Sequence, residues 1–156
     1  MGQVFEVMLD YFDSSDWKYT AISDETIRVD FSGDHGNYTC FAKELNPREG
    51  CLFYCTCPVK VPEHQRPEAA KYFTLANYGL IVGNFEMDWS DGEVRFKTSL
   101  YSNGQEFTSD LLEPLVWNNI VIMDKYFPGL MALLYGNLSA EAAVSMVEAE
   151  TQGEPS

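Results

Sequence analysis

Apolar residues at the start of the chain recur at the spacing of one face of an α-helix. Positions i, i+1, i+4, i+5 and i+8 are filled by Val4, Phe5, Met8, Leu9 and Phe12. Side chains at this spacing form one stripe along a helix. The pattern ends near Ser14 and predicts an amphipathic first helix.

Between residues 18 and 58 the apolar period changes to two, which is typical of half-buried strands. The alternating segments are YTAIS, TIRVDFS, NYTCFAKEL and CLFYCTC, and residues that favour turns separate them. They predict an antiparallel meander of three to four strands. A tight turn centred on Pro47 and Arg48 would place Cys40 opposite Cys55.

Helical patterns dominate the next part of the chain, apart from one further pair of strands. A second helix is predicted to begin around Pro62 or Pro67 and to continue through EAAKYFTLANYG, where Gly79 offers a C-terminal stop. The two strands lie in the segment GNFEMDWSDGEVRFK, residues 83–97.

A third helix is predicted from Ser109 or Asp110 to Tyr126. Pro128 should interrupt this helix, because proline lacks the amide hydrogen that a helix interior needs. The segment LMALLYG is therefore expected to form a further helical segment beyond a kink or a break.

The order of these elements is helix, strand meander, helix, strand pair and helices. It indicates the α+β class, with an antiparallel sheet of about five to six strands and helices packed on one face. The 156 residues, 46% of them apolar, suit a single domain over residues 1–150. Ser139 is expected to cap a short last helix, and residues 151–156 are expected to form a disordered tail.

The balance of charges narrows the classes of partner. The chain has 24 acidic and 10 basic residues, which give a formal net charge of −14 at pH 7. A field of that sign repels phosphate backbones and anionic lipid head groups, so we expect neither nucleic acid nor a membrane as partner. Glu6 and Asp10 interrupt the apolar N-terminal stretch, which is therefore not predicted to be a signal peptide or a membrane span. We expect a cytoplasmic protein without a cofactor.

Four cysteines raise the question of a zinc site. Cys51, Cys55 and Cys57 share one face of a predicted strand, but at about 3.3 Å per residue the first and the last lie ~20 Å apart. A tetrahedral zinc holds its sulfur ligands at about 2.3 Å, so all four cysteines cannot bind one ion. We interpret them as small buried hydrophobic residues, with a redox or metal role as the alternative.

The two histidines, His35 and His64, do not have the spacing of a known metal or catalytic motif. The chain contains no HExxH, no GxSxG and no GxxxxGK[ST] motif. We expect both side chains at solvated positions, and we predict no catalytic residue and no metal ligand.

Residues 83–97 contain four acids within eight positions, namely Glu86, Asp88, Asp91 and Glu93. The pair Asp91-Gly92 is typical of a type I′ hairpin with a two-residue loop, which would pair Ser90 with Glu93. This register sets two acids opposite two bases, Asp88 opposite Arg95 and Glu86 opposite Lys97. On the other face it pairs Trp89 with Val94, Met87 with Phe96 and Phe85 with Thr98.

Three interpretations of these acids stay open. They form the polar face of the strand pair, they belong to a recognition surface for a partner, or they act as a general acid and base whose pKa values are tuned by burial. A calcium-binding EF-hand loop is excluded. A loop starting at Asp88 would need Asp or Asn at position 90 and glycine two places after Asp91.

The run NYGLIVGNFEMDWSDGEVRFKTSL, residues 77–100, resembles the YbjN family of bacterial sensory-transduction regulators, and most closely its cyanobacterial members. The likeness extends to TIRVDFSGDHGNYTC, VPEHQRPEAAKYFTLANYGL and MDKYFPGLMALLYG. It implies a fold like that of class I type III secretion chaperones, an α/β sandwich that usually dimerises and holds partner segments on an apolar surface. It implies no catalytic residue and no cofactor.

Our first hypothesis is a non-enzymatic cytosolic module, chaperone-like or regulatory, that acts as a homodimer and binds an unidentified protein partner. Its candidate partner or dimer surface comprises Tyr72, Phe73, Ala76, Tyr78, Glu86, Asp88, Arg95 and Lys97. We expect the apolar stripes of the first two helices to be core rather than interface, since such a stripe normally faces its own domain. A second hypothesis is a metal-binding protein or an enzyme that uses the carboxylates of residues 86–93 with His35 or His64. A third is a structural subunit of a larger assembly.

Overall fold

The computed structural model describes residues 2–46 and 49–152. Its α-helices are α1 (Gln3–Ser14), α2 (Arg66–Gly79), α3 (Ser109–Gly136) and α4 (Ala140–Gln152), and a short 3₁₀ helix, η1 (Glu63–Gln65), precedes α2. Its strands are β1 (Tyr19–Ala21), β2 (Thr26–Ser32), β3 (Asn37–Leu45), β4 (Gly50–Thr56), β5 (Asn84–Met87) and β6 (Val94–Tyr101). The predicted α+β class is confirmed.

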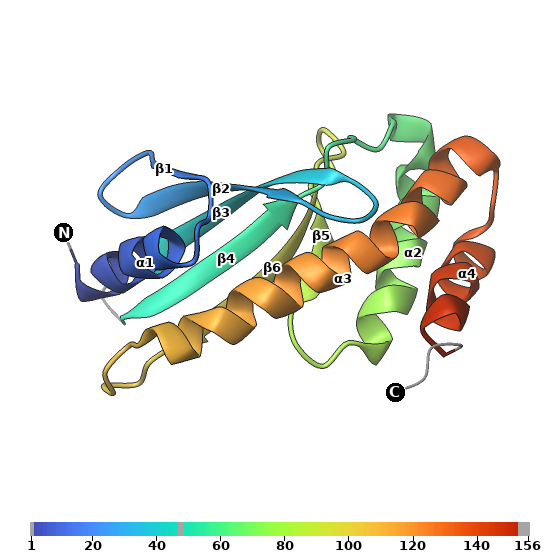
Figure 1. Ribbon diagram of the computed structural model, residues 1–156. Coiled ribbons are helices and arrows are strands. Elements are labelled where there is room, and N and C mark those ends of the chain that lie inside the picture. Colours follow the sequence, from blue (N-terminus) through green and yellow to red (C-terminus); the bar gives the residue numbers. More distant parts are fainter. Residues whose placement is uncertain (1, 47–48, 153–156) are drawn as a thin grey trace.

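The six strands form one open antiparallel sheet in the order β1-β2-β3-β4-β6-β5 (Figure 1). The predicted meander is therefore confirmed, and the last hairpin is added to it through β6. Cys40 lies opposite Cys55, as predicted. The turn centred on Pro47 and Arg48, from which that register was inferred, lies outside the described residues.

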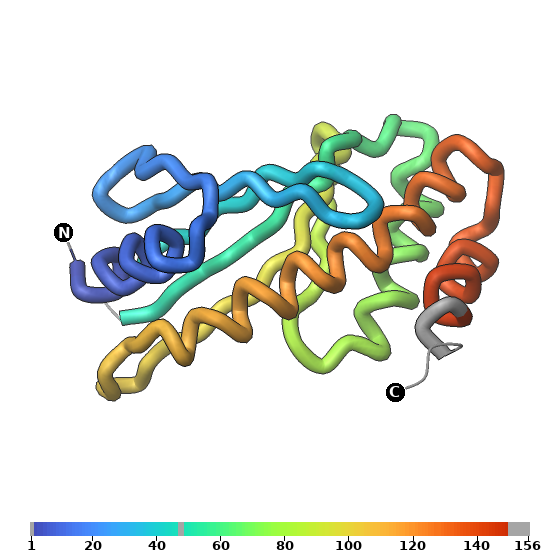
Figure 2. Tube along the Cα trace, in the orientation of Figure 1, coloured from blue at the N-terminus to red at the C-terminus, as the bar shows by residue number. Residues whose placement is uncertain are grey.

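Helices cover only one face of this sheet. Helices α1 and α3 cross the same face, and α3 continues past the sheet to meet α2 and α4 (Figures 1 and 2). On the covered face Phe12 of α1 stacks on Phe53 of β4, at 6.5 Å between ring centroids, and Phe73 of α2 stacks on Phe85 of β5 at 5.3 Å. Most strand residues on this face are buried, and most of those on the other face are exposed or half-buried. This alternation is what places the core on one side only.

A buried amide fastens α3 to the middle of the sheet. The Nδ2 group of Asn119 donates hydrogen bonds to the carbonyl oxygens of Phe53 on β4, at 3.0 Å, and Phe96 on β6, at 2.9 Å. The Thr98 hydroxyl of β6 donates to the Leu115 carbonyl of α3 at 2.9 Å. These bonds form where no water competes, so they fix the position of the helix as well as its distance from the strands.

Helix α3 runs without interruption through Pro128, so the predicted break at this residue is wrong. Proline cannot donate to the carbonyl four residues earlier, which belongs to Asp124. His35, with its proton on Nδ1, donates to that carbonyl at 3.1 Å and replaces the missing bond. The Asp124 carboxylate also accepts the amide hydrogens of Asp34 and His35, both at 3.0 Å, and the Tyr38 hydroxyl at 2.7 Å. The β2–β3 turn is thus held on α3 where proline leaves the helix backbone free.

The two terminal helices have polar anchors of their own. The buried carboxylate of Glu44 on β3 accepts the Phe5 amide hydrogen of α1 at 3.1 Å. At the start of α4 the Ser139 hydroxyl accepts the Ala142 amide hydrogen at 3.1 Å, which confirms the predicted cap. Helix α4 runs to Gln152, and the rest of the predicted tail lies outside the described residues. Within the described part of the chain, no helix is both long and apolar enough to cross a membrane.

Candidate functional site

The hairpin of β5 and β6 contains the four acids, and its register differs from the predicted one. Glu86 lies opposite Arg95, and Met87 opposite Val94. The register of the two strands is therefore shifted by two residues from the expected pairing. Asp88 is not opposite Arg95 and instead lies beside Glu93, whose carbonyl accepts the Asp88 amide hydrogen at 2.8 Å. The predicted pairs of Glu86 with Lys97, Met87 with Phe96, Phe85 with Thr98 and Trp89 with Val94 are wrong for the same reason.

Contacts with the preceding segment explain the longer loop. The Val61 amide hydrogen is donated to the Gly92 carbonyl at 2.9 Å, and the Arg66 guanidinium donates to the Trp89 carbonyl at 3.2 Å. Gly92 has a φ angle of +81°, which glycine adopts without strain. These contacts hold a four-residue loop, Trp89 to Gly92, in place of the two-residue loop that Asp91-Gly92 favours locally.

A shift by two residues keeps every side chain on its expected face, so Glu86 still meets basic residues. Its carboxylate accepts hydrogen bonds from Arg95 Nε at 2.8 Å and from Lys97 Nζ at 2.7 Å. Partial burial acts to raise the pKa of Glu86, but the bonds and charges of Lys97 and Arg95 outweigh it and lower the pKa below its ordinary value. Glu86 is therefore ionised and paired in the folded chain.

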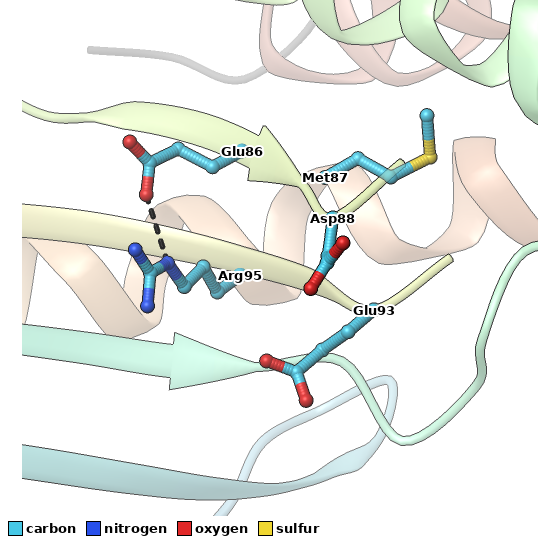
Figure 3. A pocket seen from close by; sticks show the side chains of 5 residues that line it. All are labelled: Glu86, Met87, Asp88, Glu93 and Arg95. Carbon is cyan, nitrogen blue, oxygen red and sulfur yellow. Dashed lines mark hydrogen bonds and ion pairs between the residues drawn. The ribbon is translucent and has the colours of Figure 1, made fainter. Parts of the chain in front are cut away.

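The other acids of the hairpin bond locally. The hydroxyl and amide of Ser90 donate to the Asp88 carboxylate and lower its pKa, and the Glu93 amide hydrogen together with Lys60 does the same for Asp91. Glu86, Met87, Asp88, Glu93 and Arg95 line a hollow of about 360 Å³, in which Glu86 is joined to Arg95 (Figure 3). A general acid at neutral pH requires a carboxyl with a raised pKa, and the shifts resolved here are in the opposite direction.

The different register changes which acids are neighbours, so a metal site formed by them has to be considered again. In the described residues, no three side chains among His, Cys, Asp and Glu come close enough together to hold a metal ion. His35 is half-exposed and lies 3.4 Å from the Asp124 carboxylate on α3, and His64 is exposed in η1. The histidines and the hairpin acids are thus placed on different elements, and the structure does not gather them at one site.

All four cysteines are buried and free, in agreement with their interpretation as small hydrophobic residues. Burial raises the pKa of Cys51 to about 12 and that of Cys57 to about 11. The pKa of Cys55 is raised as well, by its contact with Cys40 and by burial. Metal binding and nucleophilic attack both require the thiolate, which these shifts disfavour.

The candidate partner residues divide into two groups. Tyr72, Phe73 and Ala76 are buried between α2 and its neighbours, so they are not available on the surface of a single chain. The first-helix stripe Val4, Phe5, Met8 and Phe12 is likewise core. Tyr78 is 95% exposed at the end of α2, and Glu86, Asp88, Arg95 and Lys97 lie on the hairpin.

Arg95 and Lys97 belong to a larger surface, the uncovered face of the sheet, which we call the open face. One row of directly opposed residues crosses it from β2 to β6, and we call it the basic–aromatic row. It comprises Arg28, Phe41, Tyr54 and Lys97. The rings of Phe41 and Tyr54 lie 5.3 Å apart, and the Arg95 guanidinium lies 5.0 Å from the Tyr54 ring. Two aromatic rings are thus flanked by a base at each end of the row.

Basic residues are concentrated on the open face. Arg28, Lys43, Arg95 and Lys97, four of the ten bases in the chain, project from its strands, together with two acids, Asp30 and Glu86. The strand positions alone therefore sum to +2 in a chain whose formal net charge is −14, and two further acids, Asp88 and Glu93, border them at the hollow beside Arg95. Lys43 has no ion-pair partner in the part of the chain that the structure describes.

Arg28, Phe41, Lys43 and Tyr54 were not among the residues predicted to form a partner surface. Each occupies a polar-face position of a predicted strand, so the parity of the alternation places them all on one face. What the alternation leaves undetermined is the order of the strands across the sheet. The register that sets Cys40 opposite Cys55 already sets Phe41 opposite Tyr54, but only the pairing of β6 with β4 brings Lys97 beside Tyr54.

Comparisons with known proteins agree with this architecture. The model of the YbjN family, described as "Putative bacterial sensory transduction regulator", matches residues 5–131. The crystal structure of YbjN, "a putative transcription regulator from E. coli", superimposes with a TM-score of 0.50 at 14% sequence identity, and the match covers 95% of this chain and 92% of that one. At this identity the likeness concerns the fold. No protein with a curated description matches the chain at a significant level.

The corrected register leads to a test in solution. We expect Glu86 and Arg95 to be coupled by about 0.2–1 kcal/mol in a double-mutant cycle, because they are opposite in charge and in direct contact. The measurement is the free energy of unfolding in urea for Glu86→Gln, Arg95→Gln and the double variant. The matched cycle of Asp88→Asn with Arg95→Gln should give a coupling near zero. A larger coupling for Asp88 than for Glu86 would indicate that Asp88 lies opposite Arg95, as the two-residue loop requires.

The coupling should also depend on pH with a defined sign. The pKa of Glu86 is lower in the folded chain than in the unfolded one. Its contribution is therefore fully present above the unfolded pKa of about 4.3 and is lost as the pH falls through the folded pKa. A coupling that persists when the pH is well below both values would contradict the ionic origin of the contact.

Proposed function

The chain belongs to the YbjN family, and on that premise we propose that it is a non-enzymatic regulatory module that binds a segment of a partner protein on the open face. The observation that supports this proposal is a six-stranded sheet with helices on one face only. A sheet face of this size that keeps two aromatic rings and four bases at its surface is an expected place for recognition. We further propose a cytoplasmic location and a closer relation to the cyanobacterial members of the family.

Exposed aromatic and basic side chains support protein binding in physical terms. Aromatic residues and arginine are enriched among the residues that dominate binding energies, because they bury a large area and lose little conformational freedom. The rings of Phe41 and Tyr54 lie side by side near the centre of the open face, tilted by 32° to each other, and Arg28 and Arg95 lie near them. The hollow of the β5–β6 hairpin adjoins this group through Arg95.

We also propose that the chain forms a homodimer, and that the dimer uses a different surface. Tyr78 and Ile81, at the end of α2 and in the loop that follows, are 95% and 98% exposed. Val82 and Leu75 beside them are partly exposed, which gives a contiguous apolar group. A second copy would remove this apolar area from water, and the open face would stay free for a partner.

Partner binding can be tested by affinity capture from the native host, followed by quantitative mass spectrometry. We expect a partner that the unmodified chain retains and that the variant Phe41→Thr/Tyr54→Thr loses by about 10-fold or more, because the aromatic centre of the surface is removed. Tyr135→Thr is the matched control, since Tyr135 is exposed on α3. Equal capture by both variants would show that partners bind elsewhere, and capture of none by the unmodified chain would contradict the proposal. Unfolding curves of each variant verify that the fold is kept.

Dimerisation can be measured separately by sedimentation equilibrium at high micromolar concentration. We expect a dimer that weakens by about 10-fold or more in Tyr78→Ser/Ile81→Ser, since a buried apolar side chain of this size contributes about 1.5–3 kcal/mol. Phe41→Thr/Tyr54→Thr should dimerise like the unmodified chain. A monomeric unmodified chain would contradict the dimer, and a dimer lost only in the Phe41 and Tyr54 variant would place the second copy on the open face.

A further inference from the structure

We propose that the open face binds an acidic segment in an extended conformation, with acidic side chains at positions i and i+4 and an aromatic or large aliphatic side chain at i+2. The proposal rests on the proposed function and names the chemistry of the partner at the same surface. It is derived from the spacing of the basic–aromatic row, from its charge and from the ion pairs that occupy it.

The spacing of the row matches that of an extended peptide. Arg28, Phe41, Tyr54 and Lys97 are opposed across β2, β3, β4 and β6, so the row crosses three gaps between strands. Strands lie about 4.8 Å apart, which places the two bases ~14 Å from each other. In an extended chain, residues i, i+2 and i+4 project from one side, and the first and last are also ~13–14 Å apart. Two acids can therefore meet Arg28 and Lys97 while the residue between them lies on the aromatic rings.

The charges select an acidic partner. The strands of the open face carry four bases and two acids, and Lys43, one row away from Phe41, is available to a further acid. The row itself holds two bases and no acid. At physiological ionic strength the Debye length is about 8 Å, so a short segment on the row is governed by these bases more than by the distant acidic surface.

The same numbers disfavour two other occupants. A second copy bound face to face would bring the bases of its own row close to Arg28 and Lys97, which repel them. A nucleic acid also offers negative charge and bases that stack on aromatic rings. Its backbone continues beyond the row, however, and there it meets the acidic remainder of the chain.

Glu86 acts as an internal competitor for the incoming acid. Its carboxylate holds both Arg95 Nε and Lys97 Nζ, at 2.8 and 2.7 Å, so the base at one end of the row is occupied in the free chain. Asp30 lies 3.4 Å from Arg28 at the other end, although both side chains are about half exposed. A partner carboxylate must displace Glu86 from Lys97. Neutralising Glu86 should consequently strengthen binding, an effect opposite to that expected if Glu86 itself contacted a basic partner.

The test uses the full chain and short fluorescent peptides measured by anisotropy. The probe peptide contains Glu-Ser-Phe-Ser-Glu in a Gly/Ser background. A spacing control, Glu-Glu-Phe-Ser-Ser, has the same composition and charge, and a charge control replaces both Glu by Lys. A single-stranded oligonucleotide of similar length tests the nucleic-acid alternative. We expect the probe to bind about 5-fold or more tightly than the spacing control, and more weakly as salt is added.

Variants of the chain assign the contacts. Lys97→Glu and Arg28→Glu should each weaken probe binding by about 10-fold or more, because each replaces attraction by repulsion. Glu86→Gln should tighten it by about 2- to 5-fold, since it frees Lys97 and Arg95. Lys125→Glu is the matched control on the helical side of the molecule and should change affinity by less than about 2-fold.

The outcomes distinguish a failure of the acidic motif from a failure of the proposed function. Equal binding of the probe and the spacing control, or no effect of Lys97→Glu, would overturn the acidic motif while leaving capture through Phe41 and Tyr54 intact. Tighter binding of the Lys peptide or of the oligonucleotide would overturn it in favour of a different partner. Absence of binding to any probe would overturn the motif, and absence of a captured partner as well would contradict the proposed function.

Discussion

Helices α1, α2 and α3 pack on one face of the sheet and α4 packs on α2 and α3, and this one-sidedness determines the rest of the structure. Each strand alternates buried and exposed side chains, so a single face can contribute to the core. Helix α3 is held over that face by polar contacts at defined points, the Asn119 amide on β4 and β6 and the Asp124 carboxylate on the β2–β3 turn. Because these contacts are specific in direction, the helix cannot slide to cover other strands. In the described part of the chain, no helix covers the opposite face of the sheet.

The open face is electrostatically distinct from the molecule that carries it. A chain with a net charge of −14 repels most anions, yet the basic–aromatic row on its open face contains two bases, two neighbouring aromatic rings and no acid. Glu86 moderates that face, since it neutralises Arg95 and Lys97 while the surface is free. An arrangement of this kind favours selectivity over affinity, because a weakly acidic segment does not displace Glu86 and a more acidic one does.

Much of the fold could be predicted from periodicity, and the failures have physical causes. The strands TIRVDFS and NYTCFAKEL show clean alternation, and the position of Cys40 opposite Cys55 agrees with the tight turn that the sequence predicts between β3 and β4. The hairpin register was wrong because Asp91-Gly92 reports only a local turn preference, whereas bonds from Val61 and Arg66 fix a longer loop. Pro128 did not break α3, because His35, 93 residues earlier in the chain, satisfies the freed carbonyl of Asp124. The open-face residues Phe41 and Tyr54 could be placed on the polar side of their strands. Their adjacency to each other follows from the register that sets Cys40 opposite Cys55, whereas the position of Lys97 beside them depends on the pairing of β6 with β4, which periodicity does not contain.

The central claim is that the uncovered sheet face is the surface on which the partner is bound. Hydroxyl-radical footprinting with mass spectrometry measures this directly, by comparing side-chain oxidation in the free chain and in the complex purified from the native host. We expect Phe41 and Tyr54 to be oxidised in the free chain and protected in the complex, while the oxidation of Tyr135 and Trp117 on α3 changes little. Protection of the α3 residues with unchanged oxidation of Phe41 and Tyr54 would contradict it.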